Sequence, residues 1–365
     1  MIFSSWMRMY KIVRVIGLVW GVLLSLNLAA QPKYWIFFQD KDLCSLPAVS
    51  EQTLGNRLLL GLSLVQETDL PLKTAYLQAV RVLGVEVHHS SRWFNAVSAT
   101  LTVEQLEKVR GLPFVREVLP LDTDMFIASS SVGSFTTQQQ DFVLAQIQAE
   151  LFREQGLTAK GVTIGVIDAG FFAADSSVAL RHVFSNRRVK GIRDYVKPER
   201  AGEWLYRIAD SYSDLHGTEV MAAIGGIDME EKVQYGAAVN ASYYLARTDY
   251  TLREWRGEGD NWIAAMEWMD SLGVRLINTS LGYAKGFTDP SENYEPRQMD
   301  GKTSLISRAA QLAADQKGIL LVVSAGNEGD DKKWRIISTP ADARGVLSVG
   351  ATNRQLWNRI GYSSV

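Results

Sequence analysis

Short, uninterrupted apolar runs alternate with helical patterns from residue 141 onward, and this alternation limits the fold more than any other feature. Three of the runs lie at 162–167, 241–247 and 319–324. Continuous apolar runs of this length are typical of strands that are buried on both faces. Because helical patterns separate the runs, the sequence predicts an α/β fold, with a mostly parallel sheet and helices on both faces.

Two of the helical patterns also show where each helix should begin and end. The first has Asp260 as its candidate N-cap and Gly273 as its stop. The second follows Thr303 and stops at Gly318. The apolar positions at helical spacing are Trp262, Ile263, Met266 and Met269 in the first pattern, and Leu305, Ile306, Ala309, Ala310 and Ala313 in the second. Two more strands are predicted beside these helices, at 274–280 and 345–352.

A shorter alternation of strands and helices precedes residue 122. The strand-like runs lie at 33–38, 85–90, 93–101 and 114–121. A helix is expected at 75–84, and another should begin after Thr102 as its N-cap and end at Gly111. This order predicts a small α+β domain at 31–121 with a ferredoxin-like layout.

Residues 122–140 differ in composition from the regions on both sides. Ser, Thr and Gln dominate the stretch DTDMFIASSSVGSFTTQQQ, and it shows no periodicity. We interpret it as an exposed linker, which is where proteolytic cleavage concentrates. The predicted organisation is therefore a small domain at 31–121, a linker with a processing site at 122–140, and a larger domain at 141–365.

The first 30 residues have the pattern of a secretory signal peptide. Arg8, Lys11 and Arg14 precede the uncharged run IGLVWGVLLSLNLAA, which ends at Ala30. A transmembrane anchor is the alternative, but the run is shorter than the roughly 20 residues that a span needs. Leu28 occupies a position where a small residue would mark the cleavage point, so the sequence does not define where the signal peptide is cut. We expect export, with a secreted, periplasmic or cell-surface location and no membrane span after cleavage.

Charge and cysteine content narrow the function classes. The formal net charge of −2 over 365 residues gives no reason to expect nucleic acid or an anionic membrane as a partner. The single cysteine, Cys44, has no partner for an internal disulfide. A buried small side chain is the favoured interpretation, with a free thiol or a bond to another chain as alternatives.

Candidate site residues follow three of the predicted strands where each strand ends. In open parallel sheets, ligands bind outside the carboxyl ends of the strands. Asp168 ends the first strand, and His216 opens a helix-like run, HGTEVMAAIGG, that can face the sheet. The remaining candidates follow two further strands, and they are Ser280, Leu281, Gly282, Ala325, Gly326 and Asn327.

An aspartate, a histidine and an asparagine at one sheet edge form a chemically coherent set. A carboxylate can fix the tautomer of an imidazole, whose other nitrogen then takes a proton from a nucleophile. A helix N-terminus disfavours the charged imidazole, so we expect His216 to stay neutral at rest. A side-chain amide such as that of Asn327 can donate to a developing oxyanion. Taken singly, Asp168 could be a polar strand end and His216 an exposed helix start.

Four blocks of the sequence together resemble the conserved blocks of the subtilisin-like serine proteases (subtilases). The blocks are VTIGVIDAGF, HGTEVMAAIGG, INTSLG and LLVVSAGNEG, in that order. The resemblance implies a subtilisin-like sheet, the subtilisin triad order of Asp, His and Ser, and Asp168 orienting His216. It also implies that Asn327 supplies an oxyanion donor. The implied substrate-binding segments are Ser280, Leu281 and Gly282 on one side and Ala325 and Gly326 on the other.

Residues 33–120 resemble the propeptide of the same family in layout. The implied role is a folding helper that also occupies the active site until it is cut off, so the partners would be a peptide substrate and the chain's own propeptide. A permanent extra domain is the alternative. The family needs no cofactor; calcium is frequent in it, but no ligand loop can be assigned by residue here.

Two departures from the family pattern stand out. Ala169 and Glu219 replace the Thr and His that are common in the first two blocks, and neither is a triad residue. More seriously, no block like GTSMAAP, which carries the family's nucleophile, occurs in the 365 residues. The nearest string, GKTS at 301–304, precedes the oxyanion block, and Pro296 excludes a phosphate-binding loop there.

These departures leave three hypotheses. The favoured one is a fragment of a secreted serine endopeptidase zymogen, truncated before the catalytic serine and inactive by itself. The second is a non-catalytic pseudo-protease that binds peptides in the same groove. A nucleotide-binding enzyme is the third, and it lacks any G-x-G-x-x-G or phosphate-loop motif.

Overall fold

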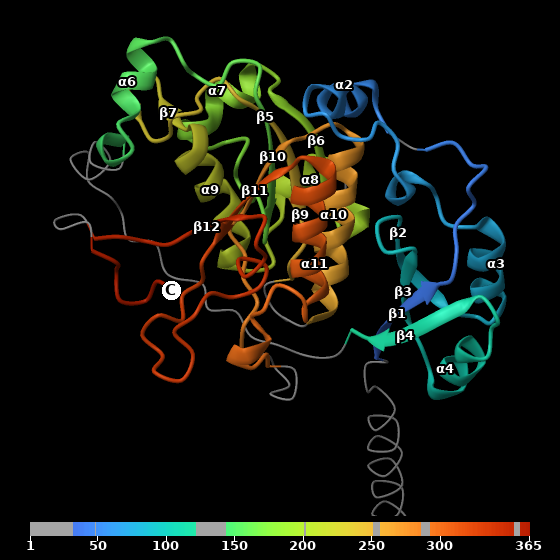
Figure 1. The fold of residues 1–365 in the computed structure, drawn as a ribbon. Helices are drawn as coiled ribbons and strands as arrows, with labels where there is room; N and C mark the ends of the chain where they lie inside the picture. The colour runs from blue at the N-terminus through green and yellow to red at the C-terminus, as the bar shows by residue number, and fades with distance from the viewer. Residues whose placement is uncertain are drawn as a thin grey trace, which may run out of the picture.

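The computed structural model describes residues 32–47, 49–121, 144–200, 202–250, 256–285, 293–353 and 358–365 (Figure 1). The predicted signal peptide at 1–30 and linker at 122–140 lie outside the described residues. We call residues 32–121 the N-terminal domain and residues 144–365 the C-terminal domain. No helix within the described ranges has the length and apolar character that crossing a membrane would require.

A six-stranded parallel sheet forms the centre of the C-terminal domain, as the sequence predicted. Its strand order is β12-β11-β10-β5-β9-β6. The strands are β5 (Thr163–Asp168), β6 (Val189–Asp194), β9 (Ser242–Arg247), β10 (Leu276–Thr279), β11 (Leu320–Ser324) and β12 (Leu347–Val349). Every neighbouring pair is parallel, so the carboxyl ends of all six strands share one edge.

Helices cover both faces of this sheet, because the strand residues alternate between two cores. Ile167 of β5 packs with α10 (Gly259–Ser271) and α11 (Leu305–Leu312) on one face. Ile164 and Val166 pack with Met221 of α9 (His216–Gly225) on the other face. This period of two is the pleat of a strand buried on both sides.

The helix stops were predicted correctly, but the helix starts were not. Gly273 has a φ of +81° after α10, and Gly318 has a φ of +66° after the π-helical turn η8 (Ala313–Lys317) that extends α11. The N-cap of α10 is Glu258, not Asp260. Asp260 lies inside the helix, where it is buried in an ion pair with Lys33 of the other domain.

The second helix also begins one residue later than predicted. Ser304, not Thr303, is the N-cap of α11, and its hydroxyl accepts from the Ile306 amide at 3.2 Å. Thr303 instead donates to the carboxylate of Asp300 in the preceding loop.

The N-terminal domain has the predicted ferredoxin-like layout. Its antiparallel sheet has the order β2-β3-β1-β4, built from β1 (Lys33–Phe38), β2 (Glu86–Ser91), β3 (Ala96–Thr100) and β4 (Val115–Pro120). Two helices, α3 (Thr74–Val82) and α4 (Val103–Arg110), connect the strands. Thr102 is the N-cap of α4, in a reciprocal capping box with Gln105, as its sequence position predicted.

Two features of this domain were not predicted. A further helix, α2 (Glu51–Leu59), and a 3₁₀ turn, η1 (Glu67–Asp69), lie between β1 and α3. Cys44 is exposed, so the expectation of a buried thiol was wrong. Its segment is a turn on the surface of the domain, where no core is available to cover a small side chain.

The remaining elements are short and lie between the main ones. They are α6 (Ala149–Glu154), η2 (Val178–Leu180), α7 (Arg181–Ser185), η3 (Pro198–Arg200), α8 (Trp204–Arg207), η4 (Tyr212–Leu215), β7 (Ile227–Asp228), β8 (Val233–Gln234), η5 (Arg256–Glu258) and η7 (Pro296–Gln298).

The two domains share one apolar core. Trp35, Phe37 and Trp93 of the N-terminal domain pack in the same cluster as Ile263 and Ile306 of α10 and α11. The open face of the N-terminal sheet is therefore buried against the helix layer of the C-terminal domain, which Figure 1 shows beside it. The interface is therefore apolar like the core of a single domain, and burial of its apolar surface stabilises the contact between the two domains.

Candidate active site

Asp168 and His216 form a direct pair at the carboxyl edge of the sheet. Asp168 is the last residue of β5 and His216 the first of α9, and Asp168 Oδ1 lies 2.7 Å from His216 Nδ1. The aspartate is completely buried, whereas the imidazole is about one-third exposed at 34%. The other carboxylate oxygen, Oδ2, is buried without a hydrogen-bond partner among the described residues. The Ala169 amide also donates to Oδ1 at 2.8 Å, so His216 and this amide together compensate the carboxylate.

Glycine at position 217 allows the start of α9 to approach the end of β5. The Gly217 amide donates to the Gly170 carbonyl at 2.9 Å. A Cβ on Gly217 would lie 2.4 Å from that same oxygen and 3.0 Å from Asp168 Cβ. The glycine after His216 is thus a requirement of the Asp168–His216 contact.

The charge balance around His216 differs from the expectation. The Asp168 carboxylate raises the pKa of His216 to about 8, against the opposing effect of burial, and Glu219 and Asp249 add smaller contributions. A full charge at 2.7 Å outweighs the partial charge of a helix terminus. The prediction that the helix start keeps the imidazole neutral was therefore wrong, and the imidazolium is favoured below about pH 8.

Asp249 is a buried carboxyl near this pair that the sequence prediction missed. It follows β9 by two residues, and it accepts a hydrogen bond from the Tyr283 hydroxyl at 2.7 Å. Burial is the main cause that raises its pKa to about 6, and the nearby Asp168 contributes to this rise. The rule that ligand-binding residues follow strand ends would have identified Asp249 if it had been applied to β9.

Arg247, also missed, connects the site to the turn before His216. It is the last residue of β9, in register with Asp168, and only 2% exposed. Its guanidinium donates to the Ala169 carbonyl at 2.9 Å and to Asp214 at 3.1 Å. Asp214 in turn accepts from the Asp210 amide at 2.5 Å, which holds the turn that leads into α9.

The other six predicted residues lie on the same edge but do not contact the pair through hydrogen bonds between described residues. Ser280, Leu281 and Gly282 follow β10, which separates β5 from β11. Ala325, Gly326 and Asn327 follow β11. The Asn327 side chain is exposed, and Gly326 has a φ of +104°, which favours glycine there. Their roles remain predictions.

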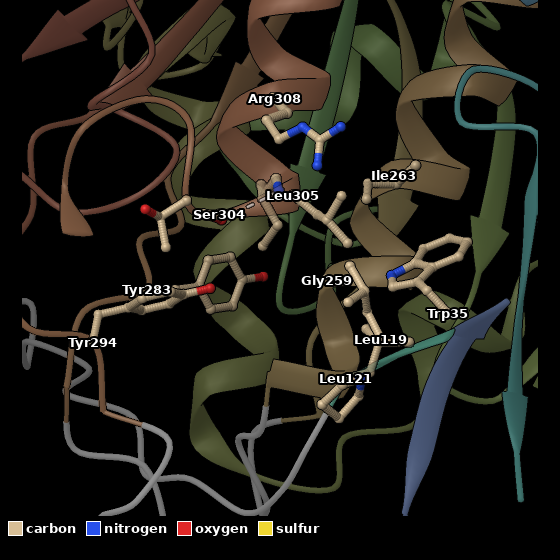
Figure 2. Close-up of a pocket in the computed structure, with 13 residues that line it drawn as sticks. Trp35, Leu119, Leu121, Gly259, Ile263, Tyr283, Tyr294, Ser304, Leu305 and Arg308 are labelled. Carbon is tan, nitrogen blue, oxygen red and sulfur yellow. Dashed lines mark hydrogen bonds between the residues drawn. The ribbon is translucent and has the colours of Figure 1, made fainter. Parts of the chain in front are cut away.

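A pocket of about 220 Å³ lies between the end of β4 and the helix layer (Figure 2). The N-terminal domain contributes Trp35, Leu119 and Leu121 to its lining, and the C-terminal domain contributes Ile263 and Tyr283 among others. Tyr283 is the residue that also donates to Asp249. The last described residues of the N-terminal domain thus lie beside the segment that follows β10.

The described parts of the chain contain no group of three or more His, Cys, Asp or Glu side chains placed to hold a metal ion. The expectation of calcium therefore stays a prediction without assigned ligands.

Comparison with known families identifies the class of protein to which this sheet and the attached ferredoxin-like domain belong. Residues 159–364 match the subtilase family (peptidase S8), and residues 33–133 match the peptidase S8 propeptide domain of Bacteroidota. This chain belongs to the subtilase family.

Individual relatives are distant in sequence. The chain is 26% identical over 287 residues to subtilisin NAT of Bacillus subtilis subsp. natto, a match that covers 77% of this chain and 62% of the relative. Subtilisin E of Bacillus subtilis (strain 168) is 26% identical over 275 residues, which cover 74% of this chain and 59% of the relative. The chain therefore spans about three fifths of the length of these subtilisins.

A longer match and a structural likeness complete the comparison. An alkaline protease of Alkalihalobacillus alcalophilus is 23% identical over 358 residues, covering 97% of this chain and 76% of the relative. The epidermin leader peptide processing serine protease of Staphylococcus aureus, solved as an S393A mutant, aligns with a TM-score of 0.59 at 14% identity. That alignment covers 92% of this chain and 73% of the solved one, and it establishes the subtilisin-like fold.

Proposed function

We propose that this chain belongs to a secreted subtilisin-like endopeptidase, made as a zymogen, that cuts peptide bonds through an Asp-His-Ser triad. Asp168 and His216 are the first two members of this triad. In this proposal the serine belongs to a segment that would follow Val365. The observation that carries the proposal is the 2.7 Å contact between Asp168 and His216 at the carboxyl edge of the sheet.

In the proposed mechanism, some residues transfer or hold a proton and others bind the substrate. Asp168 holds the Nδ1 proton of His216, so that Nε2 takes the proton of the serine and later gives it to the leaving amine. The Asn327 amide donates to the oxyanion. Ser280, Leu281 and Gly282 bind the substrate backbone, and with Ala325 and Gly326 they line the side-chain pocket.

Exposed apolar side chains on the sheet support the idea of a further covering element. Leu320 is 50% exposed on β11, and Leu347 and Val349 on β12 are 52% and 48% exposed. A sheet face with such residues is normally covered by a helix or a second layer. A segment carrying the serine fits this position, on the same face of the sheet as α9.

The N-terminal domain is proposed to act as the intramolecular propeptide. Leu119 and Leu121, at the end of β4, line the pocket beside Tyr283. The chain that follows them enters the predicted linker with its processing site. Occupation of the substrate groove by this segment would block hydrolysis until the linker is cut.

The raised pKa of His216 gives the proposed enzyme an alkaline profile. The base must be neutral to accept the serine proton, and the pKa of His216 is about 8. We therefore expect kcat/KM to rise as the pH rises through about 8.

The test is the enzyme extended beyond Val365 by the segment that follows in its reading frame. We expect peptide hydrolysis that a serine-directed inhibitor abolishes and that His216→Ala removes. His88→Ala, which changes an exposed histidine of the N-terminal domain, should retain activity. A folded, extended protein that binds peptides without cutting them would overturn the proposal in favour of a non-catalytic peptide-binding protein.

A further inference from the structure

Residues 51–69 form an arm of the N-terminal domain that a ferredoxin-like layout does not require. The arm begins with α2 and ends with η1, and Figure 1 shows α2 well apart from the sheet β1–β4 and near one end of α10. It lies on the C-terminal ends of two helices of the C-terminal domain, α10 and the helix formed by α11 and η8. This contact is separate from the pocket at the end of β4.

The glycines that end those two helices fit the arm closely. A Cβ on Gly273 would lie 2.7 Å from Gln52 Cγ and 3.1 Å from the Thr53 amide nitrogen. A Cβ on Gly318 would lie 2.4 Å from Leu60 Cδ1. The arm therefore packs onto the helix ends more closely than any side chain there would permit.

Polar side chains of the arm donate to carbonyls at the same helix ends. Thr53 donates to the Asp270 carbonyl at 2.9 Å, and Asn56 donates to the Gly273 carbonyl at 3.0 Å. On the second helix, the Gln66 amide donates to the Gln316 carbonyl at 2.5 Å. The last carbonyls of a helix have no partner within the helix and carry its negative end, so donors are the matching chemistry.

Four buried charges lie at the centre of this contact, one acid and one base from each domain. Arg57 and Asp69 belong to the arm, and Asp270 and Lys317 belong to the C-terminal domain. Lys317 Nζ lies 2.7 Å from Asp69, and Arg57 lies 3.6 Å from Asp270, so both cross-domain pairs are of opposite sign. None of the four side chains is more than 3% exposed.

The same four charges can also pair within each domain. Arg57 contacts Asp69 at 2.6 Å inside the arm, and Lys317 lies 3.9 Å from Asp270 inside the C-terminal domain. Separation of the domains would therefore leave a neutral pair on each surface. A buried charge stranded without a partner is the costly case, and this arrangement avoids it on both sides.

We propose that the arm is a recognition element. Through it, the C-terminal domain selects a propeptide whose charges are opposite in sign to the charges that they face. Its receptor surface consists of Asp270, Gly273, Gln316, Lys317 and Gly318. The partner is an arm with a cation facing Asp270 and an anion facing Lys317. The proposal deepens the propeptide role and rests on the proposed function only for the meaning of the selection, since the docking itself needs no catalysis.

The first test measures hydrogen exchange in the 365-residue chain by mass spectrometry. Lys317→Met should make peptides covering α2 exchange roughly 100-fold faster, because it removes a buried cation from the centre of the contact. Asn56→Ala, a mild change, should give about a fivefold increase. Exchange in β1–β4 should stay unchanged, which separates undocking of the arm from unfolding of the domain.

A matched control uses a lysine in an exposed pair. Lys108 pairs with Glu104 on α4, and both side chains are more than half exposed. Lys108→Met should leave α2 exchange as it is. Equal exchange of α2 in wild type, Lys317→Met and Asn56→Ala would overturn the proposal, and so would loosening of β1–β4 to the same extent as α2.

The second test inverts the charges of the arm. The variant Arg57→Asp with Asp69→Lys keeps an opposite pair inside the arm but places like charges against Asp270 and Lys317. We expect α2 to lose protection, and we expect the further changes Asp270→Lys and Lys317→Asp to restore at least tenfold of it. Failure of the restored variant to regain protection, with β1–β4 intact, would contradict charge-matched recognition.

The extended enzyme separates this proposal from the proposed function. If the extended enzyme is active, charge inversion of the arm should shorten the lag before activity appears after synthesis. If the extended enzyme hydrolyses nothing, the triad assignment fails while the exchange results stand. If activity appears but the exchange results do not depend on the arm, the recognition proposal fails alone.

Discussion

Two buried carboxylates of this molecule, Asp168 and Asp69, differ in the kind of partner that compensates them. Asp168 faces His216, whose charge changes near neutral pH. Asp69 faces Arg57 and Lys317, which both donate hydrogen bonds to its carboxylate. Burial opposes ionisation of Asp69, but hydrogen bonds from these two cations outweigh it and lower its pKa to about 2. The first centre is suited to proton transfer, and the second is a fixed structural contact.

The largest effect is expected from a substitution that breaks the Asp168–His216 pair. Asp168→Asn in the extended enzyme should lower kcat about 10⁴-fold, the loss known for the corresponding change in another serine protease, because the tautomer of His216 is no longer fixed. In the 365-residue chain, the pKa of His216 should fall from about 8 toward its ordinary value, as followed by NMR titration. Glu230→Gln, which changes an exposed acid, is the control. An unchanged His216 pKa would refute the pairing.

The next effect concerns the second centre and its acid stability. Asp69→Asn should destabilise the chain by about 3–5 kcal/mol at pH 7, because it removes one member of a buried charge cluster. Since the folded pKa of Asp69 is lowered to about 2, its contribution is present above the unfolded value and is lost as the pH falls toward 2. Urea unfolding at pH 7 and pH 3 should therefore show a smaller difference at pH 3. A difference that is the same at both pH values would argue against an ionised Asp69.

A smaller effect tests whether Arg247 positions the histidine. Arg247→Met should lower the pKa of His216, since the turn through Asp214 would no longer hold His216 against Asp168. Arg200→Met is the matched control, because Arg200 contacts Asp210 at the periphery of the same cluster. Loss of stability without movement of the His216 pKa would show that Arg247 has only a structural role.

The smallest effect separates the two acids near His216. Burial raises the pKa of Asp249 to about 6, so its ionisation in the folded chain costs stability as the pH rises from the unfolded value through 6. Asp249→Asn should therefore be more stable than wild type at pH 8 and similar to it below pH 4. The pKa of His216 should fall only slightly, because Asp249 is a minor contributor. A fall as large as that in Asp168→Asn would reverse the roles of the two acids.

The sequence predicted the elements whose burial is apolar. β5, β9 and β11 are continuous apolar runs, and the strand-end rule led from them to Asp168 and Asn327. β6 was missed because Val189–Asp194 is a half-buried edge strand with Lys, Arg and Asp among its six residues. The run VKGIRD has neither a continuous apolar stretch nor strict alternation of polar and apolar residues, so it resembles a loop.

Polar burial explains the other misses. In α2 the buried side chains are Thr53 and Arg57, so hydrophobic periodicity could not reveal a helix that packs by hydrogen bonds and charge. Asp260 was mistaken for an N-cap because its partner, Lys33, is 227 residues away in the chain. Long-range charge pairs of this kind leave no local pattern in a sequence.

The exposed Cys44 makes the fate of the N-terminal domain directly visible. It is the one cysteine of the 365 residues, and it lies on the N-terminal domain. A thiol-reactive dye would therefore label that domain and leave residues 144–365 unlabelled. In the extended enzyme, dye retained on the full-size particle after linker cleavage would report a propeptide that is cut but still held, and its disappearance would time the moment of departure.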